Sequence, residues 1–118
     1  MSATSGKVII AGGRDFTNYE LLLTAIVNAN FEIGEIVSGG ARGADALGEL
    51  AAHDLGIPVT QFLADWNTHG RAAGPIRNCA MAKYATALIA MWDGKSRGTQ
   101  HMINEARKQG LLVHIEYY

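Results

Sequence analysis

The 118-residue sequence has a single cysteine, Cys79, and therefore cannot form a disulfide within the chain. Such cysteine usage is typical of a reducing compartment, so we expect a cytoplasmic location. Cys79 lies in no nucleophile motif, and we interpret it as a small packing side chain. No spacing of histidine, cysteine or carboxylate residues is typical of a metal site, and we predict neither a metal nor a cofactor.

Long apolar runs and an excess of one charge are also missing. No hydrophobic stretch approaches the roughly 20 residues of a membrane helix, and the short polar segment 1–6 lacks the features of a signal peptide. The formal net charge of −1 disfavours a general nucleic-acid binder. At 48% hydrophobic residues, the chain can bury a core as one domain, residues 1–118.

The stretch WDGKSRGTQHM, residues 92–102, contains Gly94-Lys95-Ser96. These three residues match the end of a phosphate-binding P-loop. A P-loop requires a further glycine five residues before that Gly-Lys-Ser, and Ile89 occupies the position. The sequence therefore excludes a P-loop NTPase.

Hydrophobic periodicity predicts strands that alternate with helices along the whole chain. The predicted strands are residues 7–11, 35–38, 57–62, 86–91 and 111–116, and the predicted helices are residues 18–30, 44–55, 75–84 and 99–109. Strict alternation predicts an α/β fold, a single Rossmann-like domain with a five-stranded parallel sheet in the order 3-2-1-4-5 and helices on both faces.

Four loops follow the carboxyl ends of these strands, where open parallel sheets bind their ligands. These loops are residues 12–17, 39–43, 64–74 and 92–98, and they or the helix starts beyond them contain five of the six arginines. Nine of the 14 glycines lie in the same loops. Glycine allows close backbone approach, and arginine and helix N-termini bind anions, so this edge is predicted to be an anion site.

The candidate ligand-binding residues come from all four loops. They are Gly12, Gly13, Arg14 and Asp15; Ser38, Gly39, Gly40, Arg42, Gly43 and Asp45; Trp66, Arg71, Arg77 and Asn78; and Asp93, Gly94, Arg97, Gly98 and Thr99. Asp15 is as suited to supporting its loop as to contacting a ligand. An acidic residue at position 45 has three possible reasons: the helix dipole, contact with a ligand, or a role as a base. Trp66 could stack on a base or pack its loop, and we expect His69 to be solvated.

Four of these motifs, GGRDF, SGGARGAD, DW…HGRAAGPIRN…MA and RGT, together resemble the YspA-like (cpYpsA-related) branch of the SLOG superfamily. The resemblance covers nearly the whole chain. It implies a Rossmann-like fold and a nucleotide-derived ligand, in a branch common in phages and bacteria and mostly of unknown function.

The chain is more distantly similar to the "lonely guy" phosphoribohydrolases. The resemblance matches their helix arginine and the methionine after it to Arg77 and Met81, and their glycine-threonine loop to residues 94–99. Their catalytic glutamate falls on Met102, which can neither activate water nor stabilise an oxocarbenium-like centre. Glu105, one turn further, would face another direction.

The residues favour a binding protein for a phosphorylated nucleoside derivative, ADP-ribose-like or a cyclic nucleotide signal, acting as a sensor or, if phage-encoded, as a sequestering protein. A nucleotide N-glycosidase or phosphoribohydrolase remains an alternative, with Arg77 and Asp45 as catalytic candidates and Asp15 or Asp93 as further acids. Single-stranded DNA binding is a third, weakened by the lack of an aromatic ladder. We expect a nucleotide-derived small molecule and further copies of the chain as partners, and no membrane.

Overall fold

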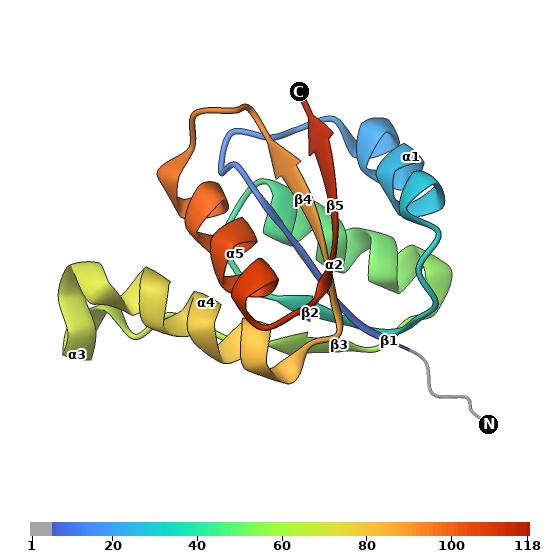
Figure 1. Ribbon diagram of the computed structural model, residues 1–118. Coiled ribbons are helices and arrows are strands. Elements are labelled where there is room, and N and C mark those ends of the chain that lie inside the picture. Colours follow the sequence, from blue (N-terminus) through green and yellow to red (C-terminus); the bar gives the residue numbers. More distant parts are fainter. Residues whose placement is uncertain (1–5) are drawn as a thin grey trace.

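A computed structural model describes residues 6–118, which leaves most of the predicted non-signal segment 1–6 outside the described residues. Five parallel strands form one sheet in the order β3-β2-β1-β4-β5, as the sequence predicted (Figure 1). The strands are β1 (Gly6–Gly12), β2 (Ile33–Ser38), β3 (Val59–Gln61), β4 (Ala87–Trp92) and β5 (Leu112–Tyr117). The helices are α1 (Tyr19–Ala29), α2 (Ala44–Leu55), α3 (Trp66–His69), the 3-10 turn η1 (Gly70–Ala72), α4 (Ala73–Tyr84) and α5 (Arg97–Lys108).

The sheet is covered on both faces, and alternate residues of its central strands enter two separate cores. Val8 and Ile10 pack with the side chains of α1 and α2, whereas Ile9 and Ala11 pack with those of α4 and α5. All but Ala11 of these four are fully buried. A central strand that is apolar on both faces is expected where helices cover both sides of a parallel sheet.

Several elements begin or end away from their predicted limits. The last helix starts at Arg97 rather than residue 99, because Ser96 caps it with its side-chain oxygen. The helix expected at residue 75 starts at Ala73 and accommodates Pro75 in its first turn. Strand β3 is shorter than predicted and lies at one edge of the sheet, next to Pro58. The long connection at residues 64–74 forms α3 and η1, which project beyond the sheet (Figure 1).

None of the helices in the described part of the chain combines the length and apolarity needed to cross a membrane.

The carboxyl ends of β1 and β4 and the start of α2 are in backbone contact. Gly43 has a φ of +77°, and a Cβ atom on it would collide with the carbonyl oxygen of Gly13. This position therefore requires both the conformational freedom of glycine and its lack of a side chain.

We expect Gly43→Ala to lower the free energy of unfolding by about 2 to 5 kcal/mol, the combined cost of a left-handed backbone and an overpacked contact. Gly56→Ala is the matched control, because Gly56 has a φ of +70° but no neighbour within 4 Å of its added Cβ. The control should lose about 1 kcal/mol in urea denaturation. Equal losses in the two variants would show that the backbone approach at Gly43 is not tight.

Candidate functional site

A cleft of about 850 Å³ opens at the carboxyl ends of β1 and β4, between the first turns of α4 and α5. The first loop contributes residues 12–15, the second contributes Arg42 and Asp45, and the helices contribute Arg77 and residues 96–99. The sequence placed its anion site at this edge, and the fold brings those loops to one cavity. Its volume is within the usual range for small-molecule sites.

Four arginines border the cleft, and their side chains differ in how tightly the fold holds them. Arg14, Arg42 and Arg97 are exposed, whereas Arg77 is half-buried. The Nη1 of Arg77 donates to the carbonyl oxygen of Gly39 at 2.8 Å, and its Nε donates to Asn78 Oδ1 at 3.0 Å. Arg77 is thus held in place, while the other three can adjust to a ligand. Burial lowers the pKa of Arg77, but a guanidinium remains charged at neutral pH.

The start of α5 supplies backbone N–H groups to the same cavity. Ser96 caps the helix by accepting from the N–H of Thr99 at 3.4 Å, and its carbonyl accepts from the indole of Trp92 at 3.1 Å. Asp93 accepts from the N–H groups of Lys95 and Ser96 and so orders the preceding turn. The N–H groups at the first positions of an α-helix have no partner within the helix and are suited to an anion.

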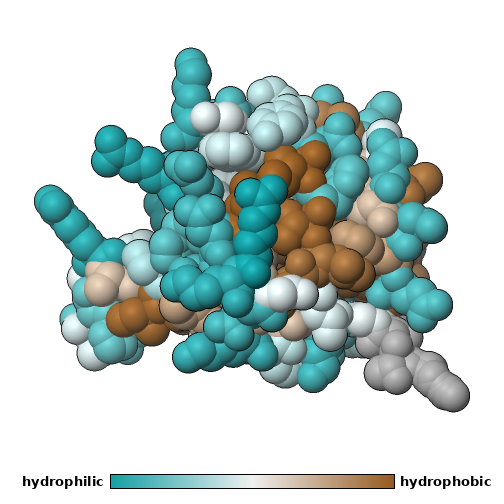
Figure 2. All heavy atoms as spheres, viewed as in Figure 1, coloured by the Kyte–Doolittle hydropathy of each residue, from teal (hydrophilic) through white to brown (hydrophobic). Residues whose placement is uncertain are grey.

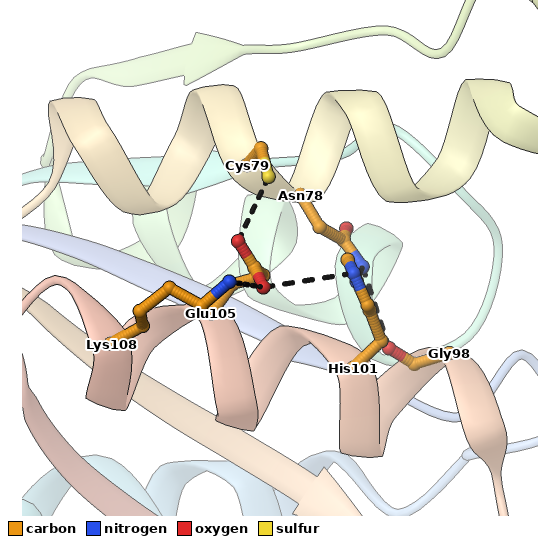
Figure 3. Close-up of polar contacts among 6 residues, drawn as sticks. All are labelled: Asn78, Cys79, Gly98, His101, Glu105 and Lys108. Carbon is orange, nitrogen blue, oxygen red and sulfur yellow. Dashed lines mark hydrogen bonds and ion pairs between the residues drawn. The ribbon is translucent and has the colours of Figure 1, made fainter.

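Asn78 joins α4 to α5 beneath the cleft (Figure 3). Its amide nitrogen lies 3.1 Å from His101 Nδ1 and 3.4 Å from the carbonyl oxygen of Gly98. Because an amide nitrogen only donates, Nδ1 of His101 must accept, which places the imidazole proton on Nε2. That nitrogen lies 3.9 Å from a carboxylate oxygen of Glu105.

Glu105 faces α4 rather than the cleft, as the sequence predicted for a residue one turn beyond Met102. Its carboxylate accepts from Cys79 Sγ at 2.8 Å and contacts Lys108 Nζ at 3.1 Å (Figure 3). The Glu105 hydrogen bond raises the pKa of the Cys79 thiol, which disfavours a thiolate nucleophile. Cys79 therefore has a packing role between the two helices.

Asp45 is a buried acid at the first turn of α2. Its Oδ2 accepts from the N–H of Ala41 at 3.2 Å. Desolvation raises its pKa to about 6, although that hydrogen bond and the positive charge of Arg77 act in the opposite direction. Gly39 lies between the two groups, since a Cβ on it would collide with Arg77 Nη1 and lie 2.8 Å from Asp45 Oδ2. Asp45 is thus a group that changes charge near neutral pH, in the cleft wall.

Trp66 and Arg14 lie where the main cleft meets a second chamber. The guanidinium of Arg14 lies over the Trp66 ring, 5.8 Å from its centroid. The second chamber, of about 550 Å³, is also lined by Gly39, Gly40 and Leu63. The two chambers share Arg14, Ala41, Arg42, Trp66 and Arg77.

Not every predicted residue lines a chamber. Ser38 is fully buried, donates to Glu49 at 2.6 Å and accepts from the N–H of Gly40. Gly43 packs on the first loop, and Asp93 and Gly94 form the turn before α5. Arg71 lies in η1 with its side chain exposed. These residues shape the loops around the cleft.

Other residues were not selected from the sequence. His101 and Ser96 line the cleft, and the cap sequence Ser-x-x-Thr could have identified Ser96. Tyr118 is another such residue: its hydroxyl donates to Asp15 Oδ1 at 2.8 Å, and its ring packs edge-on against Phe16. No local signal could reveal this contact, because it joins positions 103 residues apart. Within residues 6–118, no cluster of three His, Cys, Asp or Glu side chains could hold a metal ion.

Comparison with known proteins identifies one family. The model described as "YspA, cpYpsA-related SLOG family" (YAcAr) matches residues 6–69. This match covers GGRDF and SGGARGAD, whereas Arg77, Met81 and residues 97–99 lie beyond it. The chain is also 42% identical over 84 residues to the Gene 61 protein of Mycobacterium phage D29, an alignment that covers 66% of this chain and 67% of the phage protein.

The fold is similar to that of DNA processing protein A (DprA) from Streptococcus pneumoniae. The TM-score is 0.75 at 18% sequence identity, and the alignment covers 92% of this chain. The chain spans about half of DprA, 49% of its length. This similarity establishes the shared architecture, including most of the chain beyond residue 69.

We expect Asp45→Asn to change how stability depends on pH. The carboxyl has a pKa of about 6 in the fold and about 3.9 in an unfolded chain. Between these values the folded state retains a proton that the unfolded state releases, so this group makes the protein less stable as the pH rises from about 4 to 6. The variant lacks that loss. Its free energy of unfolding minus that of the parent should therefore rise by up to about 3 kcal/mol between pH 4 and pH 7.5.

Urea denaturation of both proteins at several pH values measures this difference. The exposed Glu20→Gln is the control for removal of an acid, and it should follow the parent. If the difference in stability between the parent and the Asp45→Asn variant is constant with pH, the burial effect on Asp45 is contradicted.

Proposed function

The chain belongs to the YspA, cpYpsA-related SLOG family, and from that premise we propose that it binds a phosphorylated nucleoside derivative in the cleft. The observation that carries the proposal is the convergence of Arg14, Arg42, Arg77 and Arg97 with the start of α5 on one cavity. Guanidinium groups and first-turn N–H groups are complementary to phosphate oxygens.

The paired chambers support a ligand with phosphate at its centre and a bulky group on each side. Arg14, Arg42 and Arg77 belong to both chambers, so a phosphate between them would leave one chamber for each flanking group. Trp66 is half-exposed and offers a ring face on which a base can stack. ADP-ribose-like molecules and, among cyclic nucleotide signals, the cyclic dinucleotides have this form.

The role of such binding is sensing or sequestration of the ligand. The relative in a mycobacteriophage supports sequestration, in which a phage-encoded protein would withdraw a host signal. The position of Met102, buried in the cleft wall where the "lonely guy" enzymes carry their glutamate, supports binding without turnover.

Binding is tested by a thermal-shift and calorimetric screen of AMP, ADP-ribose, cyclic dinucleotides and a short single-stranded DNA. We expect a compound with internal phosphates to bind more tightly than AMP. Arg42→Ala should weaken that binding about 10- to 100-fold, because it removes a charge-assisted hydrogen bond from an exposed side chain that does not support the fold.

Arg107→Ala is the matched control, since Arg107 lies in the last turn of α5 and does not line the cleft. It should leave the affinity unchanged. No stabilisation by any nucleotide would contradict the proposal. Binding of the DNA alone, with steep salt dependence, would favour the DNA-binding alternative.

Asp45 supports hydrolysis of the N-glycosidic bond as a second candidate function. A buried carboxyl with a pKa of about 6 beside Arg77 has the properties of a general acid. In such a reaction Asp45 would give its proton to the leaving base as the bond between that base and the anomeric carbon breaks. Water would add to that carbon and release a proton, which returns Asp45 to its protonated form.

If the protein is such an enzyme, incubation with nucleoside monophosphates or NAD-like compounds releases free base, measured by liquid chromatography. Asp45→Asn should then lower kcat by at least about 100-fold, because general acid catalysis contributes that much. Release that is unchanged in the double variant Asp45→Asn/Arg77→Ala would place the activity elsewhere.

A further inference from the structure

Strand β5 leaves one edge of the sheet without a partner among residues 6–118 (Figure 1). The N–H groups of Leu112 and Tyr118 donate to the carbonyls of Thr86 and Trp92, next to and within β4. Hydrogen-bonding direction alternates along a strand, so Val113, Ile115 and Tyr117 direct both N–H and C=O away from the sheet.

This edge has little of the usual protection against pairing. The six residues LVHIEY contain neither proline nor lysine, and the backbone shows no bulge against β4. Leu112 and Tyr117 are 63% and 60% exposed. In Figure 2, drawn in the same view as Figure 1, a hydrophobic patch lies over the region of β5, between α5 and α1.

We propose that β5 is an interface with a second copy of this chain, formed by antiparallel pairing of the two β5 edges about a two-fold axis at Ile115. The pairing would join two five-stranded sheets into one. A homodimer is therefore expected through a strand edge and not through helices.

The outward-facing backbone groups restrict the register. Antiparallel strands exchange hydrogen bonds between residues whose N–H and C=O groups both point outward, which here are Val113, Ile115 and Tyr117. With Ile115 opposite its own copy, Val113 faces Tyr117 of the partner subunit and Tyr117 faces the partner's Val113. These pairs provide about six backbone hydrogen bonds.

The polar pair His114 and Glu116 selects this register from its neighbours. His114 and Glu116 lie on the same face of β5, 3.2 Å apart. With the axis at Ile115, His114 lies opposite the partner's Glu116 and Glu116 lies opposite the partner's His114. A shift of the axis to His114 or to Glu116 places like groups opposite each other, which is unfavourable. The strand is thus complementary to itself in one alignment.

The proposal does not depend on ligand binding, and its test uses the full chain without nucleotide. Light scattering on a sizing column should give twice the chain mass of 12.6 kDa at about 50 μM protein. The variant His114→Glu opposes two carboxylates and should raise the dimer dissociation constant at least tenfold. The double variant His114→Glu/Glu116→Lys places opposite charges across the axis and should recover the dimer.

Disulfide trapping tests the register in a Cys79→Ser background. Ile115→Cys places two thiols on the axis and should give a covalent dimer under mild oxidation. Leu112→Cys is the matched edge control, since its two copies would be about 20 Å apart in this alignment. A monomeric parent, a dimer that His114→Glu leaves intact, or equal trapping at positions 112 and 115 would each overturn the proposal.

Discussion

The backbone N–H and C=O of Gly13 connect the parts of the molecule on which the cleft depends. Its N–H donates to the carbonyl of Met91 at the end of β4, and its carbonyl accepts from the N–H groups of Phe16 and Ala44. One residue thereby fixes its own loop, the end of a neighbouring strand and the start of α2. A side chain at Gly13 would collide with the hydroxyl of Tyr118, so the end of β5 also contributes to this junction.

The sequence predicted the fold because its signals were local and mutually consistent. Apolar runs such as residues 86–91 can be buried only between helices, and strands that alternate with helices have few possible topologies. Gathering of the arginine-bearing loops at one edge follows directly from parallel strands. The clustering of four arginines around one cavity could therefore be expected from the sequence alone; they are Arg14, Arg42, Arg77 and Arg97.

The remaining features depend on contacts between distant positions, which periodicity cannot report. The sequence leaves three roles open for Asp45, as a residue favoured by the helix dipole, as a ligand contact or as a base. Only its burial beside Arg77 shows that its ionisation is perturbed. Arg77 is fixed by a carbonyl 38 positions earlier. Helix α5 begins two residues before its predicted start at residue 99. Gly98 lowers helix propensity there, but the Ser96 cap outweighs that cost.

The two tryptophans of the chain differ in their surroundings in a way that makes them useful reporters. Trp92 is held by the hydrogen bond from its indole to the carbonyl of Ser96, in packed surroundings beside Tyr117. Trp66 is half-exposed where the two chambers meet, with the Arg14 guanidinium over its ring. Fluorescence from Trp66 would respond to an occupied cleft against the steadier background of Trp92, so the unlabelled protein contains its own optical signal for the state of the site.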